Sequence, residues 1–284
     1  MIGFVLRILW RILIFLLGSL IVWVTVFFLF PVVDSRLPAY VALLIMYCLL
    51  AYFVIPNLIR LFRLVIKPNH IPVYVTTADG WSSDPVNIAF VCRSKRQLIR
   101  IMRRAGWYTA DKTTPRTTIK FIIGFIFGLP YPNAPFSNLY LFGRKHDIGF
   151  QIPTDVKLSP RHRHHVRFWL LGDDEMSHAH TSFWQHILRL FRGPKKQLWV
   201  GAATHDIGNF AFRTRNMQIT HKIDANTNTE RDFLINTLEQ VHAIKRQDSV
   251  QAGAPLRFRG QTMGVSIVTD GTLPVVELKD SLFL

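Results

Sequence analysis

The 284-residue sequence contains only two cysteines, Cys48 and Cys92. Cys48 falls within a hydrophobic run and Cys92 ends a predicted buried strand, so a structural disulfide is not expected. This cysteine usage is compatible with a reducing compartment. The roughly 215 residues after the hydrophobic N-terminal part are enough to bury a core without cross-links.

The sequence also lacks the short motifs that identify common enzyme classes. It contains no H-E-x-x-H zinc motif, no phosphate-binding P-loop, no G-x-S-x-G nucleophile turn and no C-x-x-C pair. It shows no internal repeat and no long low-complexity linker. A functional site must therefore be built from residues that are far apart in the sequence.

Acidic residues are scarce: 18 Asp and Glu stand against 34 Lys and Arg, which gives a net charge of +16. About +5 belongs to the first 67 residues and about +11 to the remainder. A basic surface favours polyanions, namely anionic lipid head groups, phosphorylated substrates or nucleic acid. Lipid is favoured here because the chain also carries hydrophobic runs, and each basic residue near an anionic membrane surface contributes about 1 kcal/mol.

Two hydrophobic runs occupy the N-terminal part. No charged residue lies between Arg11 and Asp34, and none lies between Arg36 and Arg60. Each run is long enough to cross about 30 Å of hydrocarbon as a helix. A cleaved signal peptide is not favoured, because no small-residue cleavage site is present and a second run follows at once. The sequence predicts a transmembrane hairpin over residues 1–67, with spans at about 12–33 and 37–59, and a soluble domain over 68–284.

The charges beside this hairpin predict its orientation. Arg7 and Arg11 precede it and Arg60, Arg63 and Lys67 follow it, whereas the connecting loop carries one Arg and one Asp. Basic residues accumulate on the cytoplasmic side of membrane helices. We therefore expect a multi-pass protein of the inner (cytoplasmic) membrane, with both termini and the soluble domain in the cytoplasm.

The remaining sequence predicts an α/β or α+β domain with a mainly antiparallel mixed sheet. Short apolar runs predict strands at residues 71–77, 86–92, 139–152, 164–171, 198–204 and 213–221. Ser94 is expected to cap a helix that stops at Gly106. A capping box, Thr227-x-x-Glu230, is expected to start a second helix, and Asp270-Gly271 to form a hairpin turn.

Three segments could contact a membrane surface. Residues 121–129 are apolar but too short to span, and an interfacial position is favoured over burial. Residues 183–191 resemble a basic amphipathic helix, for which interface and core remain equally open. The helix after Ser94 has a basic face that is either solvent-exposed or in contact with anionic lipid: Lys95, Arg96, Arg100, Arg103 and Arg104.

Polar residues interrupt the apolar strands. Alternation along 164–171 places His165 and Arg167 on one face and His164 on the other. Together with strand ends at Asp147 and Asp206, one face could gather His, Arg and carboxylate side chains. Such a set suits a phosphoryl group, because guanidinium binds it with two hydrogen bonds and histidine transfers protons near neutral pH.

A divalent metal fits the sequence equally well, with His165, Asp206, His221 and Asp224 as ligands. Structural alternatives remain open, because each histidine taken singly can be a core or surface residue. Arg231 and Asp224 could likewise form a buried salt bridge without chemistry.

The ordered motifs resemble the LssY C-terminal domain family over about residues 70–245. The segments that carry the resemblance are Asp84-Pro85-Val86-Asn87, Ala105-Gly106-Trp107, Pro135-x-Ser137, Leu141-Phe142-Gly143-Arg144-x-x-Asp147, His164-His165-Val166-Arg167-x-Trp169, Trp199-Val200-Gly201-Ala202-Ala203-Thr204-x-Asp206 and Thr220-His221-x-Ile223-Asp224 to Glu230-Arg231-Asp232. Members are often fused to phosphatidic-acid-phosphatase-type lipid phosphatases or to DedA-type membrane proteins. The resemblance therefore implies a place in envelope lipid or polyprenyl-phosphate metabolism, by association.

The motif positions imply a set of candidate site residues: Arg144, Asp147, His165, Arg167, Asp206, His221, Asp224, Glu230 and Arg231. Within it we expect the three arginines to hold phosphate, assisted by Asp147 and Glu230. His165 or His221 would act as acid or base, oriented by Asp206 or Asp224. The chain departs from the family pattern at Asn228, where an acidic residue is expected, and in having two simple spans in place of a phosphatase domain.

These features predict a membrane-anchored protein that binds or hydrolyses a phosphorylated lipid or lipid-linked head group, with an anionic membrane lipid as partner. A divalent metal is the cofactor that the residues would suit. The rival hypothesis is a non-catalytic scaffold that recruits a membrane protein partner in envelope assembly or secretion. Nucleic acid is the least favoured partner, because no platform of interleaved aromatic and basic residues is present.

Overall fold

The computed structural model describes residues 12–13, 16–55, 74–78, 80, 82–172, 196–213, 218–252, 255–259 and 266–280. The predicted segment 183–191 lies outside these residues, as do residues 56–59 of the second predicted span and residues 71–73 of the first predicted strand. The side chain of His221 is likewise outside the description.

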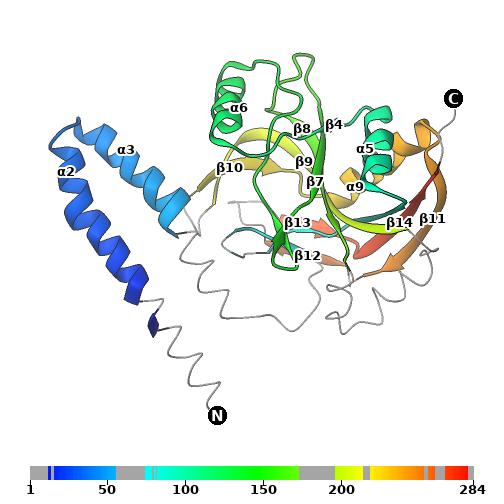
Figure 1. Ribbon diagram of the computed structural model, residues 1–284, viewed down its shortest axis with the longest axis horizontal. Helices are drawn as coiled ribbons and strands as arrows, with labels where there is room; N and C mark the ends of the chain where they lie inside the picture. Colours follow the sequence, from blue (N-terminus) through cyan, green and yellow to red (C-terminus); the bar gives the residue numbers. More distant parts are fainter. Residues whose placement is uncertain are drawn as a thin grey trace, which may run out of the picture.

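The N-terminal part forms two apolar helices joined by a tight turn (Figure 1). The first runs over Leu16–Asp34, 19 residues, and is long and apolar enough to cross a membrane. It contains a π-helical turn, η1 (Thr25–Leu29), and ends in α2 (Phe30–Asp34). The hydroxyl of Thr25 donates to the carbonyl of Ile21 at 2.7 Å, so this polar group is satisfied inside its own helix.

The second apolar helix comprises α3 (Ala39–Leu49) and η2 (Leu50–Val54). Pro38 precedes it, where the missing amide proton costs no helical hydrogen bond. Over Ala39–Val54 the helix is shorter than a typical span. Within the described residues, one helix is thus a candidate span and the second is an apolar companion, where the sequence predicts two full spans.

The rest of the chain forms an α+β domain around one large mixed sheet. The order of its strands is β11-β14-β3-β9-β8-β7-β4, and β10 also pairs with β9. All pairs are antiparallel except β14 with β3. The strands are β3 (Ile88–Cys92), β4 (Tyr108–Thr109), β7 (Ile148–Pro153), β8 (Arg163–Leu170), β9 (Gln197–Arg213), β10 (Gln218–Ile223), β11 (Ile244–Gln251) and β14 (Thr272–Leu278).

Two smaller sheets complete the domain. One has the order β2-β1-β5-β6 and the other pairs β12 with β13. Their strands are β1 (Tyr74–Thr76), β2 (Ser82–Pro85), β5 (Tyr140–Leu141), β6 (Arg144–Lys145), β12 (Leu256–Arg259) and β13 (Ser266–Thr269). The predicted antiparallel arrangement of the segments around 139–152, 164–171 and 198–204 is confirmed by the neighbours β7, β8 and β9.

The large sheet is covered on both faces, which explains why β3 is apolar throughout. Helices α5 (Lys95–Arg104) and α9 (Thr227–Gln240) cover one face (Figure 1), where Leu98 and Leu234 pack against Phe90 and Phe168. Side chains of the smaller β2-β1-β5-β6 sheet, such as Leu141, cover the other face. The sheet is therefore the middle layer of three.

Helix α6 (Pro115–Phe127) is bounded by clear sequence signals. Thr114 caps its start in a reciprocal capping box with Thr117, and Pro115 occupies the first turn. Gly128 ends it in the left-handed conformation, at φ 63°. Residues 121–127 of the predicted apolar segment 121–129 are thus the second half of a longer helix, and Gly128 and Leu129 follow its end.

Two local predictions are wrong. Asn226, and not Thr227, caps α9: the Asn226 side chain accepts a hydrogen bond from the Asn228 amide at 3.1 Å, and Glu230 turns toward β8. Asp270-Gly271 is no hairpin, because β13 pairs with β12 while β14 pairs with β11 and β3. The turn instead connects two different sheets. Strand β14 is buried between β11 and β3, and this position leaves β13 to pair with β12.

Candidate functional site

Strand β8 places polar side chains on both faces of the large sheet. Its antiparallel register with β9 sets Arg163 opposite Asp206, His164 opposite His205 and His165 opposite Thr204. Because cross-strand neighbours share a face, two separate polar groups form. The predicted separation of His165 and Arg167 from His164 follows the same alternation.

The first group centres on a buried ion pair on the face away from α5 and α9. Nε of Arg163 lies 3.2 Å from Oδ2 of Asp206, and both side chains are at most 5% exposed. Nη1 of Arg163 also donates to Oε1 of Gln151 at 2.7 Å and to the carbonyl of Ala134 at 3.2 Å. Burial lowers the pKa of Arg163, and the Asp206 carboxylate opposes that shift.

His165 is enclosed in the same group. Its Nε2 shares a hydrogen bond of 2.8 Å with Oγ1 of Thr204, and its Nδ1 lies 3.5 Å from Oδ2 of Asp206. The ring of Phe136 lies 5.4 Å away, centroid to centroid. Gly149 makes room for this phenyl ring, because a Cβ there would lie 2.2 Å from it. The histidine is therefore sealed from solvent, at 3% exposure.

Arg167 ends this row with its own partners. Nη1 lies 3.5 Å from Oδ2 of Asp84, Nε donates to the carbonyl of Ser137 at 3.3 Å, and the guanidinium lies 4.5 Å from the centroid of Phe136. Two arginines thus face two aspartates in a buried region. We call Arg163, His165, Arg167, Asp206 and Asp84 the buried ionic network. Such paired, desolvated groups fix the local structure, and removing a single partner strongly destabilises the fold.

Arg144 and Asp147 lie at the opposite end of β8. Nη1 of Arg144 donates to Oδ2 of Asp147 at 2.6 Å, and Nη2 donates to the carbonyl of Leu170. The same Asp147 oxygen accepts from the Leu170 amide at 2.7 Å. This pair joins the β5–β6 hairpin to the end of β8, and it is remote in register from Arg163 and His165.

The remaining predicted site residues lie around the start of α9. Arg231 donates to Asp232 and Asp270 at 2.8 and 2.9 Å; the structure gives it these two carboxylates as ion-pair partners, in place of the Asp224 considered from the sequence. Asp224 accepts from the Asn226 amide at 2.9 Å. Asn228, the position that departs from the family pattern, accepts from the Asp270 amide at 3.2 Å. These contacts order the junction between β10, α9 and β14.

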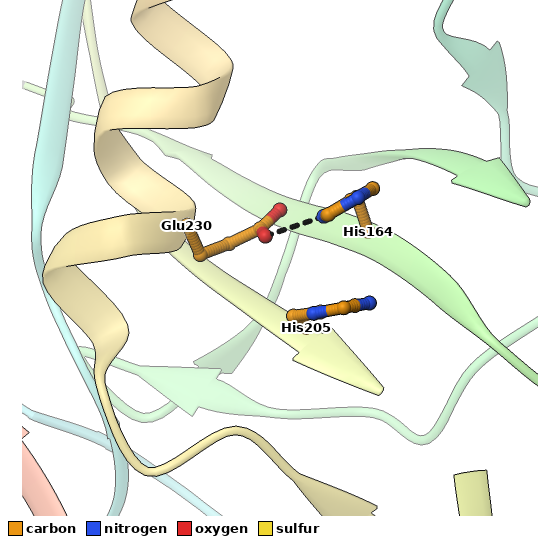
Figure 2. A group of neighbouring side chains, drawn as sticks. All are labelled: His164, His205 and Glu230. Atoms are coloured by element: carbon orange, nitrogen blue, oxygen red, sulfur yellow. Dashed lines mark hydrogen bonds and ion pairs between the residues drawn. The ribbon is translucent and has the colours of Figure 1, made fainter. Parts of the chain in front are cut away.

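The second group lies on the helix-covered face, where Glu230 points from α9 toward His164 of β8 and His205 of β9 (Figure 2). A hydrogen bond of 2.6 Å joins Nδ1 of His164 to Oε2 of Glu230. The two imidazoles stack at 4.2 Å between centroids and 19° between planes. Phe233 stacks on His164 at 3.9 Å. One ligand atom from each of the three residues lies within 4.8 Å of the other two.

The electrostatics of this second group favour neutral forms of all three side chains. Burial, with the charges of Asp206 and Asp224, raises the pKa of Glu230 to about 9. Burial lowers the pKa of His164 to about 4. Burial also lowers the pKa of His205, assisted by His164. Neutral imidazoles keep a lone pair that can bind a metal ion.

The family model described as LssY C-terminus matches residues 68–273, which include every residue of both groups. The chain belongs to the LssY C-terminus family. No curated protein and no solved structure matches the chain. Both polar groups thus lie within the LssY C-terminal domain.

The structure divides the predicted site residues of the LssY C-terminal domain into separate places. His165, Arg167 and Asp206 lie together in the buried ionic network, whereas Glu230 lies on the opposite face. Sequence reasoning did not select His164 and His205 as site residues. His164 follows Arg163 by one residue, and His205 precedes Asp206 by one residue. Because the two strands were expected to be antiparallel neighbours, this matching spacing was the available signal.

Proposed function

We propose that this protein is a membrane-anchored member of its family whose domain rests on the bilayer and binds or hydrolyses a phosphorylated lipid or lipid-linked head group. The observation that carries the proposal is the outer side of α6. Its apolar side chains are uncovered although the helix belongs to a folded domain: Ile119, Ile122, Ile123, Ile126 and Phe127. Adjacent exposed apolar side chains of this kind mark a surface that meets an apolar partner.

Contacts on its inner side fix the orientation of α6. Arg161 donates through Nε to the carbonyl of Phe125 and through Nη2 to the carbonyl of Ile126, both at 2.6 Å. Gly124 is buried close to Pro160. These contacts satisfy carbonyl groups at the end of the helix and hold its apolar side outward. An outward apolar side is unexpected unless a partner covers it.

A bilayer is the partner that this helix fits best. At 13 residues α6 extends about 20 Å, too short to span a membrane but suited to lying in its interface. Lys112, Arg116 and Lys120 lie before or within its first half and are exposed, so basic groups are available beside the lipid phosphates. The same chain also carries a helix that would hold it at a membrane, because Leu16–Asp34 is long and apolar enough to cross one. In this proposal α3 and the residues after it complete a second span, with both termini in the cytoplasm.

The docked helix would bring one end of β8 to the head groups. Arg161 joins α6 to the residues that begin β8, and the ring of Phe121 lies 5.5 Å from the Arg163 guanidinium. His164 follows Arg163 directly and lies at the same end of β8, on the opposite face. Head-group chemistry would therefore take place at the His164–Glu230 end of the sheet. Of the predicted site residues, Glu230 and Asp224 would take part there, while His165, Arg167 and Asp206 would support the strand from the opposite face of the sheet.

Fluorescence quenching in nanodiscs tests the docking of α6. The full chain carrying Cys48→Ser and Ile126→Cys receives an environment-sensitive dye at residue 126, and the lipids carry brominated acyl chains. We expect strong quenching at residue 126, because the side chain would lie in the hydrocarbon boundary. A matched variant, Gln247→Cys on the exposed edge strand β11, should show none. Equal signals from the two positions would rule out the docked orientation.

Lipid analysis tests the ligand. The detergent-purified full chain is expected to retain a phosphate-containing lipid that mass spectrometry identifies, and the Glu230→Gln variant should retain less. Release of phosphate or head group from nanodiscs of that lipid would establish hydrolysis. If the parent and the Glu230→Gln variant retained equal amounts of lipid, the lipid would not bind at the His164–Glu230 end of the sheet.

A scaffold is the second candidate, and the buried ionic network favours it. Its charges are paired and sealed, as in a structural core, so the residues with the most conspicuous chemistry need no substrate. A scaffold predicts a protein partner that binds the nanodisc-embedded chain, with no lipid turnover.

A further inference from the structure

We infer that His164, His205 and Glu230 form a binding site for one divalent transition-metal ion of the zinc class. The three donors come from β8, β9 and the first turn of α9, so the fold gathers them from three elements (Figure 2). The metal site stands independently of bilayer docking. The further statement that the ion receives a phosphate oxygen of the head group rests on the proposed function.

The donor spacing is close to what a bound ion requires. Ligand atoms around a tetrahedral zinc at about 2.0 Å lie roughly 3.3 Å from one another. In this protein one donor atom from each of the three residues lies within 4.8 Å of the other two, and Nδ1 of His164 lies 2.6 Å from Oε2 of Glu230. Shifts of about 1 Å, within the reach of side-chain rotation, would bring all three to one centre.

An unsatisfied buried oxygen points to a missing ligand. Glu230 is 2% exposed, and among the described residues its Oε1 has no hydrogen-bond partner. Buried carboxyl oxygens are almost always bonded, because desolvation without a partner costs free energy. A protonated carboxyl that only bonded His164 would leave this second oxygen unexplained. A metal ion would bind the carboxylate in place of its proton and account for the orphaned atom.

The elements that carry the donors are held firmly, as a preformed site requires. His164 and His205 are direct neighbours in the β8–β9 register. The start of α9 is held from two sides: the Asn87 side chain donates to the carbonyl of Thr227 at 3.1 Å, and the Thr227 hydroxyl donates to the carbonyl of Val268 at 3.0 Å. Phe233 limits rotation of the His164 ring by stacking.

The donor set selects the class of ion. Two imidazole nitrogens and one carboxylate oxygen suit Zn²⁺ and neighbouring transition metals, whereas Mg²⁺ and Ca²⁺ prefer oxygen ligands alone. Three protein ligands leave at least one coordination position open, as in catalytic zinc sites and unlike closed structural ones. Asp224 is a neighbour of this site, since its amide donates to the carbonyl of His205 at 2.8 Å, and its charge acts on both His205 and Glu230. An open position is where a phosphate oxygen would bind.

Metal binding by the full chain in detergent, without a histidine tag and after chelator treatment, tests the site. We expect one equivalent of Zn²⁺ by equilibrium dialysis and elemental analysis. His164→Ala, His205→Ala and Glu230→Gln should each weaken binding by at least about tenfold, since the loss of even an outer contact has that effect. Co²⁺ in the same site should give the intense visible absorption of a low-symmetry complex, which surface histidines do not produce.

His242→Asn is the matched control. His242 is exposed on the turn after α9 and has a φ of 53°, a conformation that asparagine tolerates, so this variant should bind Zn²⁺ like the parent. Thermal unfolding of each variant without metal separates a lost ligand from a lost fold. Folded variants that bind Zn²⁺ as tightly as the His242→Asn protein would overturn the site. Intact Zn²⁺ binding with no quenching at residue 126 would instead refute the docking alone.

Discussion

Strand β8 presents polar side chains to both faces of the large sheet, and the two sets differ in how they are paired. On one face Arg163, His165 and Arg167 are at most 3% exposed and are bonded to carboxylates, carbonyls and a hydroxyl. On the other face His164 is partly exposed and pairs with the carboxyl group of Glu230, and the imidazole of His205 stacks beside it. One strand therefore separates the buried ionic network from a group in which, among the described residues, Oε1 of Glu230 has no hydrogen-bond partner.

This difference shows why residue type alone is a poor guide to a site. Arginine, histidine and aspartate together suggest phosphate chemistry, yet in the buried ionic network their hydrogen-bonding capacity is directed at the protein itself. The pair of histidines on the other face is less conspicuous in sequence. An available coordination position and a route from solvent matter more than the number of charges.

Removal of Asp206 should give the largest effect. Asp206→Ala leaves the guanidinium of Arg163 buried beside a missing charge, and breaking such a pair costs about 3–5 kcal/mol. We expect a large fall in the unfolding midpoint of the full chain in detergent. The double variant Arg163→Met/Asp206→Leu should recover much of the loss, because it removes both charges. A small effect of Asp206→Ala would mean that the network is not the closed structural unit described above.

Adjacent histidines on opposite faces should separate stability from metal binding. His165→Ala removes a buried ring bonded to Thr204 and leaves that hydroxyl without this partner, at a cost of about 1–3 kcal/mol. Zn²⁺ affinity should stay unchanged, because His165 faces away from His205 and Glu230. His164→Ala should have the reverse profile, a lost Zn²⁺ site with a smaller change in unfolding.

Unfolding scans with and without Zn²⁺ measure both quantities on the same samples. Zn²⁺ should raise the midpoint of the parent and of His165→Ala, but not that of His164→Ala, because a ligand that binds only the folded state stabilises it. If both variants lost the Zn²⁺-dependent shift in midpoint, the assignment of metal binding to the His164 face alone would be wrong.

Much of the fold follows from local sequence signals, and the exceptions have physical causes. Apolar residues in β3, β7, β8 and β9 identified these strands, because both faces of the large sheet bury apolar side chains. The Asp270-Gly271 turn was misassigned, because a two-residue turn does not specify which strands pair across it. Glu230 was read as part of a capping box, since local spacing cannot reveal that β8 offers it a histidine.

The site was only partly predictable for the same reason. Alternation along β8 separated His165 from His164 correctly, but it could not show which face is closed. That depends on the segment around Phe136 and on Gly149, which accepts its ring, and these residues are distant in the sequence from the network that they cover. His205 joins His164 only through the β8–β9 register.

The contact between Arg231 and Asp270 should give the smallest effect, and a pH-dependent one. Burial tends to raise the pKa of Asp270, but the bonds from Arg231 and from the Thr272 amide outweigh it, so the folded pKa is lowered. A carboxyl with a lowered pKa stabilises the fold above its unfolded pKa of about 3.9 and loses that contribution as pH falls through the folded pKa. Asp270→Asn should therefore lower the unfolding midpoint slightly at pH 7, by a margin that shrinks in acid. A difference that is constant with pH, or a phosphate-binding defect in Asp270→Asn at unchanged stability, would return Arg231 to the role of phosphate ligand.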